Sequence, residues 1–237
     1  MNQTRPPHAH AGQARQAGQA GQAGPEVDGS RGLLVAPGAA DAISYVVTDL
    51  ELDGPTPGVN SMRSLASVAV TVDNAARPAP VARTLGEFSC NLQPLPGTQP
   101  HPDTAAWFAT VPEVWEAATI DPVTPSEAIT AWLAWVASLP APRVFASAPP
   151  SLDGLWVDTY LRRFTDQTLF PGPHQRDQMF TGPGMCLTTG AAVALRRQVA
   201  TITSDTLPPD WLGNFPHSHV ALEDARGYAH LLAHLLT

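Results

Sequence analysis

Three strand-like segments in succession constrain the fold of this sequence more than any other feature. They cover residues 42–52, 62–72 and 83–95, and each has the composition of a half-buried pleated strand. The connections between them are rich in Gly, Pro or Asn, a pattern typical of an antiparallel meander. The sequence therefore predicts a domain that opens with three consecutive strands.

Helical periodicity dominates the rest of the chain. Apolar spacing predicts helices over 102–118, 124–140, 151–164 and 220–236, a further helix near 191–202, and a short buried strand over 143–148. Thr124 suits the N-cap of the second helix, with Pro125 at its first position. Strands first, then helices with a strand between them, predict an α/β layered domain with a mixed sheet.

The composition changes sharply near residue 32. Residues 1–31 repeat GQA and contain almost no large apolar side chain, so burial cannot offset the entropy lost on ordering them. We expect a disordered low-complexity tail over residues 1–41 and one domain over 42–237. The tail is a tether in one interpretation; in the other it is passive or reflects a misplaced start codon.

Composition also limits the class of protein. The 237 residues are 43% hydrophobic, enough for a sizeable core, but no apolar run approaches the roughly 20 residues of a membrane span. With no signal-peptide core and two cysteines, Cys90 and Cys186, in no metal-binding spacing, we expect a soluble cytoplasmic protein with free thiols. The net charge of -8 argues against coating long nucleic acid, but not against binding a few nucleotides through metal ions.

Two acidic residues end the first predicted strand. Asp49 and Glu51 lie two apart, so both side chains project from one face, roughly 6 to 7 Å apart along the strand. Two like charges held together repel unless a cation joins them, and oxygen-rich sites favour Mg²⁺ or Mn²⁺. The alternative is an exposed edge strand on which both acids are simply solvated.

Three further residues carry ionisable groups in informative places. Asp153 follows the buried strand at the start of a helix, where α/β sites form, although an acid there also complements the helix dipole. His219 and Asp224 are five apart, about 500° of helix, so they cannot share one face of a continuous helix. A helix that begins just after His219 would let a loop histidine and a helix carboxylate reach one point.

Three short motifs give these residues a family resemblance. The segments "TDLELDGP", "SLDGLW" and "HVALED" resemble, in order and spacing, the three motifs of the DEDDh 3'-5' exonuclease superfamily, whose fold is RNase H-like. The sequence between these motifs is similar to that of a bacterial group of 3'-5' exoribonuclease-like proteins. The resemblance covers about residues 43–236 and leaves out the tail.

The resemblance implies a role for each motif residue. It implies that two divalent metal ions, Mg²⁺ or Mn²⁺, are held by four acids, with Asp49 bridging the ions, and that His219 is the general base; the acids are Asp49, Glu51, Asp153 and Asp224. It also places Leu52 and Asp53 near the terminal nucleotide, through backbone contacts.

The sequence departs from the family pattern in two places. Leu52 stands where the family commonly has Thr, and Ala148 and Pro149 lie where an Asn is often found, which concerns nucleotide preference more than catalysis. His217 competes with His219 for the role of base, and the five-residue spacing to Asp224 favours His219.

Arginine and tryptophan side chains leave two interpretations open. The arginines either contact substrate phosphates or form a solvated face; they are Arg162, Arg163, Arg196 and Arg197. The helical spacing of four tryptophans favours core packing over base stacking; they are Trp107, Trp115, Trp132 and Trp135.

These inferences converge on one function. Two metal ions held by carboxylates, with a histidine that is neutral near pH 7, suit phosphodiester hydrolysis. We expect a 3'-5' exonuclease that releases nucleoside 5'-monophosphates from short or single-stranded 3' ends, with RNA favoured over DNA by the subgroup resemblance. The alternative is a nucleic-acid-binding or scaffold protein that has kept the fold and lost turnover.

Overall fold

The computed structural model of the chain describes residues 43–73, 81–172, 174–175 and 177–237. The tail expected over residues 1–41, and with it the boundary of the domain, lies outside the described residues. Among the described residues, no helix combines the length and the apolar character that crossing a bilayer requires.

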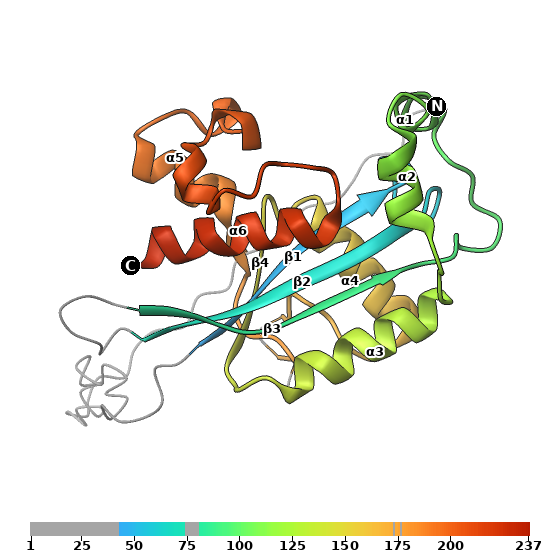
Figure 1. Cartoon of the computed structure of the whole chain (residues 1–237). Coiled ribbons are helices and arrows are strands. Elements are labelled where there is room, and N and C mark those ends of the chain that lie inside the picture. Colours follow the sequence, from blue (N-terminus) through green and yellow to red (C-terminus); the bar gives the residue numbers. More distant parts are fainter. Residues whose placement is uncertain (1–42, 74–80, 173, 176) are drawn as a thin grey trace, which may run out of the picture. The chain divides into compact units, whose positions relative to one another are not determined.

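A mixed five-stranded sheet forms the centre of the described domain (Figure 1). Its strands are β1 (Ser44–Leu52), β2 (Met62–Asp73), β3 (Val81–Asn91), β4 (Arg143–Ser147) and β5 (Met185–Cys186), in the order β3-β2-β1-β4-β5. The β1–β2 and β2–β3 pairs are antiparallel, which confirms the meander, whereas β1–β4 and β4–β5 are parallel. Because β1 and β4 are parallel, their carboxyl ends reach the same edge of the sheet.

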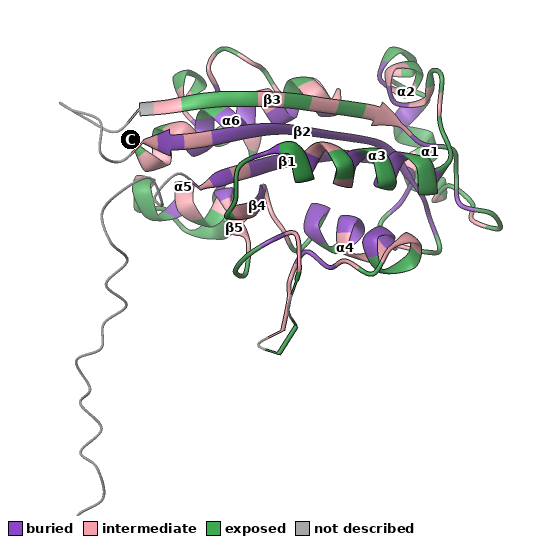
Figure 2. Ribbon diagram, turned by 90° about the horizontal axis from the view of Figure 1, so that it is seen from below, coloured by how far each residue is buried: buried purple, intermediate pink, exposed green. Residues whose placement is uncertain are grey.

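Six α-helices flank the sheet in the described residues. They are α1 (Pro102–Phe108), α2 (Pro112–Thr119), α3 (Pro125–Ser138), α4 (Asp153–Phe164), α5 (Leu187–Leu195) and α6 (Ala221–Leu236). Helices α3 and α4 pack on one face, over a cluster that includes Leu65 and Trp132, while α5 and α6 cover the other face over Val68 and Ala225. Figure 2 shows β2 buried along most of its length between these layers. The predicted α/β fold is confirmed.

The helices differ from the predicted ones at two points. The expected helix over 102–118 is two helices, because Pro112 has no N–H to donate and disfavours helical backbone at Val111, whose φ of -134° and ψ of 64° are not helical. The helix expected near 191–202 begins earlier and ends at Leu195, where Arg196 turns left-handed with φ 52°. By contrast, α3 begins as predicted, with Thr124 and Glu127 forming a capping box.

A short polar chain crosses the core between β1 and α3. The hydroxyl groups of Thr48 and Ser67 lie 2.8 Å apart, and the indole N–H of Trp132 donates to Ser67 over 2.9 Å. Each of these buried groups therefore has a partner, as polar groups in a protein interior require.

Candidate active site

Four acidic side chains meet at the shared edge of β1 and β4. Asp49 and Glu51 come from the end of β1, Asp153 is the first residue of α4, and Asp224 lies in the first turn of α6. All four are buried, and single carboxylate oxygens of Asp49, Glu51 and Asp224 lie within 4.8 Å of one another. The structure thus brings together acids that are up to 175 residues apart in the sequence (224 minus 49).

Burial and mutual repulsion raise the pKa of these acids. The pKa of Asp49 lies well above its usual value, first because of burial and then because of the charges of Asp153, Glu51 and Asp224. Burial, with repulsion from Asp224 and Asp153, raises the pKa of Glu51 to about 9. Burial raises that of Asp153 to about 7, opposed by the Ser147 hydroxyl and by backbone N–H groups of Asp153 and Ala148.

The donor set suits a hard divalent cation. No arginine in the described part of the chain forms an ion pair with any of the four acids. Clustered carboxylate oxygens without a positive partner favour Mg²⁺ or Mn²⁺, whose charge would remove the repulsion that raises the pKa values. The residues therefore fit the metal ions that the sequence motifs imply.

A short loop before α6 is hydrogen-bonded to Asp224. The backbone N–H groups of Ser218 and His219 donate to its two carboxylate oxygens over 2.8 and 3.0 Å. Helix α6 begins at Ala221, so His219 lies in the entry loop and Asp224 in the helix, as the spacing predicted. His219 has a left-handed backbone, with φ 58°.

Two histidines flank Asp224 in different ways. The Nδ1 atom of His217 lies 2.9 Å from a carboxylate oxygen of Asp224, and this hydrogen bond raises the pKa of His217. Burial and the neighbouring His217 lower the pKa of His219, whose ring contacts the ring of Trp107 at a centroid distance of 4.8 Å. A ring nitrogen of each histidine and an oxygen of Asp224 lie within 4.8 Å of one another.

The expectation that all four tryptophans are core residues is wrong for Trp107. Its side chain is 38% exposed at the end of α1 and contacts His219, because the next residue, Phe108, fills the core position instead. Trp132 is fully buried, whereas Trp115 and Trp135 are half-buried. Helical spacing alone did not indicate which of Trp107 and Phe108 turns inward.

Tyr228 belongs to this neighbourhood and was not singled out in the sequence. It lies one helical turn after Asp224, and its pKa is raised by burial and then by the charges of Asp49, Asp224 and Asp153. The i, i+4 spacing from Asp224 was the only available signal, because it places both side chains on one face of α6.

Asp53 has partners within the loop that follows β1. One carboxylate oxygen accepts the N–H of Ser61 over 2.5 Å, the guanidinium of Arg63 lies 3.9 Å away, and the backbone carbonyl accepts from His101 over 2.7 Å. Asp53 also lines a cavity of about 350 Å³ between α1 and α2. Contact of Leu52 or Asp53 with a nucleotide stays a prediction.

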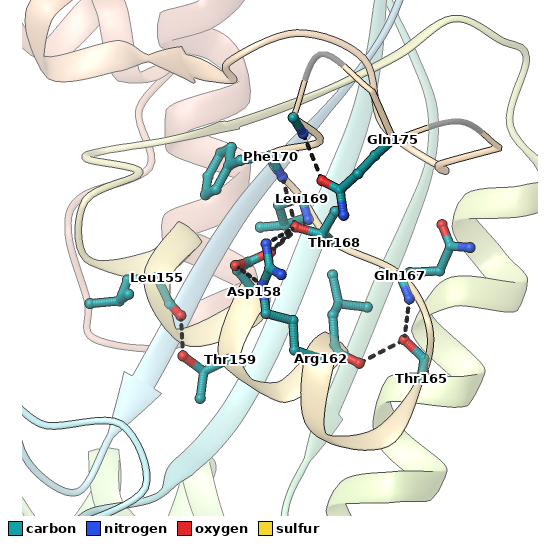
Figure 3. Close-up of polar contacts among 12 residues, drawn as sticks. Leu155, Asp158, Thr159, Arg162, Thr165, Gln167, Thr168, Leu169, Phe170 and Gln175 are labelled. Atoms are coloured by element: carbon teal, nitrogen blue, oxygen red, sulfur yellow. Dashed lines mark hydrogen bonds and ion pairs between the residues drawn. The ribbon is translucent and has the colours of Figure 1, made fainter.

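Two of the four arginines proposed to contact phosphates form hydrogen bonds within the described residues, and a third, Arg163, lies over the ring of Phe164 at 5.7 Å. Arg162 pairs with Asp158 over 2.7 Å and donates to the Thr168 hydroxyl, and Asp158 also accepts from Thr168 and from the N–H of Leu169 (Figure 3). This network anchors the segment that follows α4. Arg197 donates to the carbonyl groups of Thr201 and Thr206.

The segment after α4 also supports the start of that helix. Phe170, which follows Leu169 in the anchored segment, packs so closely on Gly154 that a Cβ atom at position 154 would lie 2.8 Å from its ring. Gly154 directly follows Asp153, so a larger residue there would force the Phe170 ring to move away from the start of α4.

Solved structures show the same fold at low sequence identity. The nuclease domain of 3'hExo, a DEDDh family member, bound to rAMP, is similar with a TM-score of 0.52 and 10% identity over 83% of this chain and 92% of that one. Exonuclease I is similar with a TM-score of 0.53 and 15% identity over 81% of this chain, which spans only 40% of that protein.

Other comparisons agree with this fold. E. coli Exonuclease I in complex with a dT13 oligonucleotide gives a TM-score of 0.51 at 16% identity, again over 81% of this chain and 40% of that one. No protein-family model and no curated protein matches the sequence. The described domain therefore has the α/β fold of these exonuclease structures.

Proposed function

We propose that this protein is a metal-dependent 3'-5' exonuclease that hydrolyses phosphodiester bonds and releases nucleoside 5'-monophosphates. The observation that carries the proposal is the cluster of Asp49, Glu51 and Asp224, with carboxylate oxygens within 4.8 Å and no arginine paired to them among the described residues. Such a cluster would only destabilise the fold if it had a purely structural role, because buried like charges cost free energy unless a cation compensates them.

The four acids would supply the oxygen ligands of two divalent ions. When bound, such ions polarise the scissile phosphodiester and lower the pKa of the attacking water. Glu51, Asp153 and Asp224 would complete the oxygen ligands from three different elements. The fixed ends of β1, α4 and α6 would set the spacing of these ligands before substrate arrives.

His219 is the better of the two candidates for the general base. His217 is hydrogen-bonded to Asp224, whereas the ring of His219 has no hydrogen bond to any residue that the structure describes. The lowered pKa of His219 keeps its imidazole neutral near pH 7, as a base that receives a proton from water must be.

The substrate is proposed to be a short or single-stranded 3' end, RNA in preference to DNA. The solved structures of the same fold hold rAMP or single-stranded oligonucleotides, and a chain with net charge -8 suits a few nucleotides better than a long duplex. Leu52 and Asp53 would approach the terminal nucleotide. Two free thiols suit a reducing compartment, and we place the reaction in the cytoplasm.

Labelled oligonucleotides test this function. RNA and DNA 20-mers with a 5' label are incubated with Mn²⁺, Mg²⁺ or chelator, and released mononucleotides are identified by chromatography. We expect stepwise shortening from the 3' end, only with metal and faster on RNA. Asp49→Asn should abolish it, while Glu87→Gln, which changes a surface acid paired with Arg226, should not. Binding without cleavage under every metal would favour the scaffold alternative.

A further inference from the structure

We propose that Trp107 is a positioning residue that holds the imidazole ring of His219 in the orientation needed to receive a proton. This inference rests on the proposed function. It is carried by three features of the described residues: the ring contact between α1 and the entry loop, the fixed backbone of that loop, and the exposure of the indole.

The backbone of His219 is fixed, but among the described residues its ring contacts only other rings. The N–H of His219 donates to Asp224, and its left-handed φ of 58° is a conformation that a non-glycine residue adopts only when its surroundings impose it. The ring makes edge contacts with Trp107 at 4.8 Å and with His217 at 4.2 Å. Without Trp107, one side of the imidazole would be open and its side-chain torsions free to change.

Further aromatic rings pack against Trp107 and support it. Its ring lies 4.7 Å from that of Phe108, which lies 4.8 Å from Trp115, and the guanidinium of Arg63 stacks on Trp115 at 5.2 Å. A continuous row of rings thus connects the paired helices α1 and α2 to the candidate base. Such edge-to-face contacts have defined geometry, so the row can fix an orientation as well as fill space.

The exposure of Trp107 argues against a mainly structural role. A tryptophan that is 38% exposed contributes little to a core that Phe108 already fills, so its removal should leave the fold intact. Its removal should still slow the reaction, because a misplacement of about 1 Å near the reacting atoms can cost about 100-fold in rate. We expect Trp107→Ala to lower kcat about 10- to 100-fold with KM nearly unchanged, and Trp107→Phe to restore most of the loss.

A double-mutant cycle separates positioning from base stacking. If Trp107 acts through His219, then Trp107→Ala should cost nothing further in a His219→Ala background. Losses that multiply in the double variant, or a rise in KM with kcat unchanged, would overturn the proposal, because a residue that stacks on a nucleobase acts without His219. Trp211→Ala is the matched control: Trp211 makes a similar ring contact with His234, at 4.1 Å, away from the acids, and kcat should not change.

A measurement without turnover keeps this inference separate from the proposed function. In ¹H–¹³C spectra of the metal-free protein, Trp107→Ala should shift and broaden the imidazole signals of His219, while Trp211→Ala should leave them in place. Unchanged His219 signals would refute positioning even in an active enzyme. If wild-type protein fails to cleave, or if His219→Ala keeps full activity, the proposed function or its base is wrong, whereas the spectra still decide whether Trp107 holds the ring.

Discussion

Thr48 and Asp49 are neighbours on β1 whose side chains project to opposite faces of the sheet, and both are buried. On one face, Thr48 joins the neutral chain with Ser67 and Trp132, in which each polar group has a partner. On the other face, Asp49 is surrounded by further carboxylates that repel it. Satisfied polar groups stabilise the fold, whereas groups of one charge held together indicate a ligand that the fold is built to receive.

The largest expected effect comes from replacing an acid on the face of β1 that carries Asp49. Asp49→Asn removes one charge from the acidic cluster, so we expect metal binding and exonuclease activity to disappear while the melting temperature of the metal-free protein stays equal or rises. Isothermal titration with Mn²⁺ and a thermal melt in chelator measure the two quantities. Wild-type affinity for Mn²⁺ in this variant would contradict the four-carboxylate site.

The next effect distinguishes the two histidines beside Asp224. His219→Ala should lower kcat about 10²- to 10⁴-fold while metal and oligonucleotide binding persist, because loss of a general base typically costs that much. His217→Ala should cost far less, since the ring of His217 is already hydrogen-bonded to Asp224. Equal losses in single-turnover assays, or a larger loss for His217→Ala, would reassign the base.

A smaller effect is expected on the opposite face, where Thr48 and Ser67 share a hydrogen bond. Ser67→Ala removes the shared partner of Thr48 and Trp132 and leaves two buried groups unpaired, which should lower the free energy of unfolding by about 2 kcal/mol. Denaturant titration measures this loss, and Mn²⁺ affinity should be unchanged. A variant of undiminished stability that bound metal weakly would show that the two faces of β1 are coupled and do not act independently.

The last expected effect is a slope in stability with pH. The pKa of Glu51 is raised from 4.5 to about 9, so the folded metal-free protein keeps a proton that the unfolded chain releases. This stabilisation is complete below about pH 4.5 and is lost as the pH rises towards 9. Melting temperature in chelator should therefore fall from pH 5 to 9, and Mn²⁺ or the substitution Glu51→Gln should reduce the slope, because Asp49 and Asp153 also have raised pKa values. A flat profile for the wild type would remove the electrostatic argument.

Local pattern predicted most of the fold. The three-strand meander and the start of α6 after His219 follow from alternation and spacing within one segment, and both are confirmed. The two-residue strand β5 has no periodicity to detect and forms only because β4 offers a parallel edge. Pro112 was a visible signal for the break between α1 and α2, but continuous apolar spacing across it outweighed that signal.

The site was less predictable than the fold. Its acids stand in motifs that can be read along the chain, whereas Trp107 reaches His219 only through the packing of α1 against a loop more than 100 residues later (219 minus 107). The same holds for the hydrogen bond from His217 to Asp224, which joins the entry loop to the first turn of α6. Tertiary contact, not residue type, gives these side chains their surroundings.

Two hydrogen bonds from the entry loop to Asp224 connect the backbone of the loop to the proposed metal site. The amide protons of Ser218 and His219 are held by the same two oxygens that would face a cation, so any rotation of that carboxylate opens or closes both hydrogen bonds together. Hydrogen–deuterium exchange at these two amides should therefore follow a Mn²⁺ titration as a pair. Metal binding could then be measured from the exchange protection of two backbone amides, without substrate or turnover.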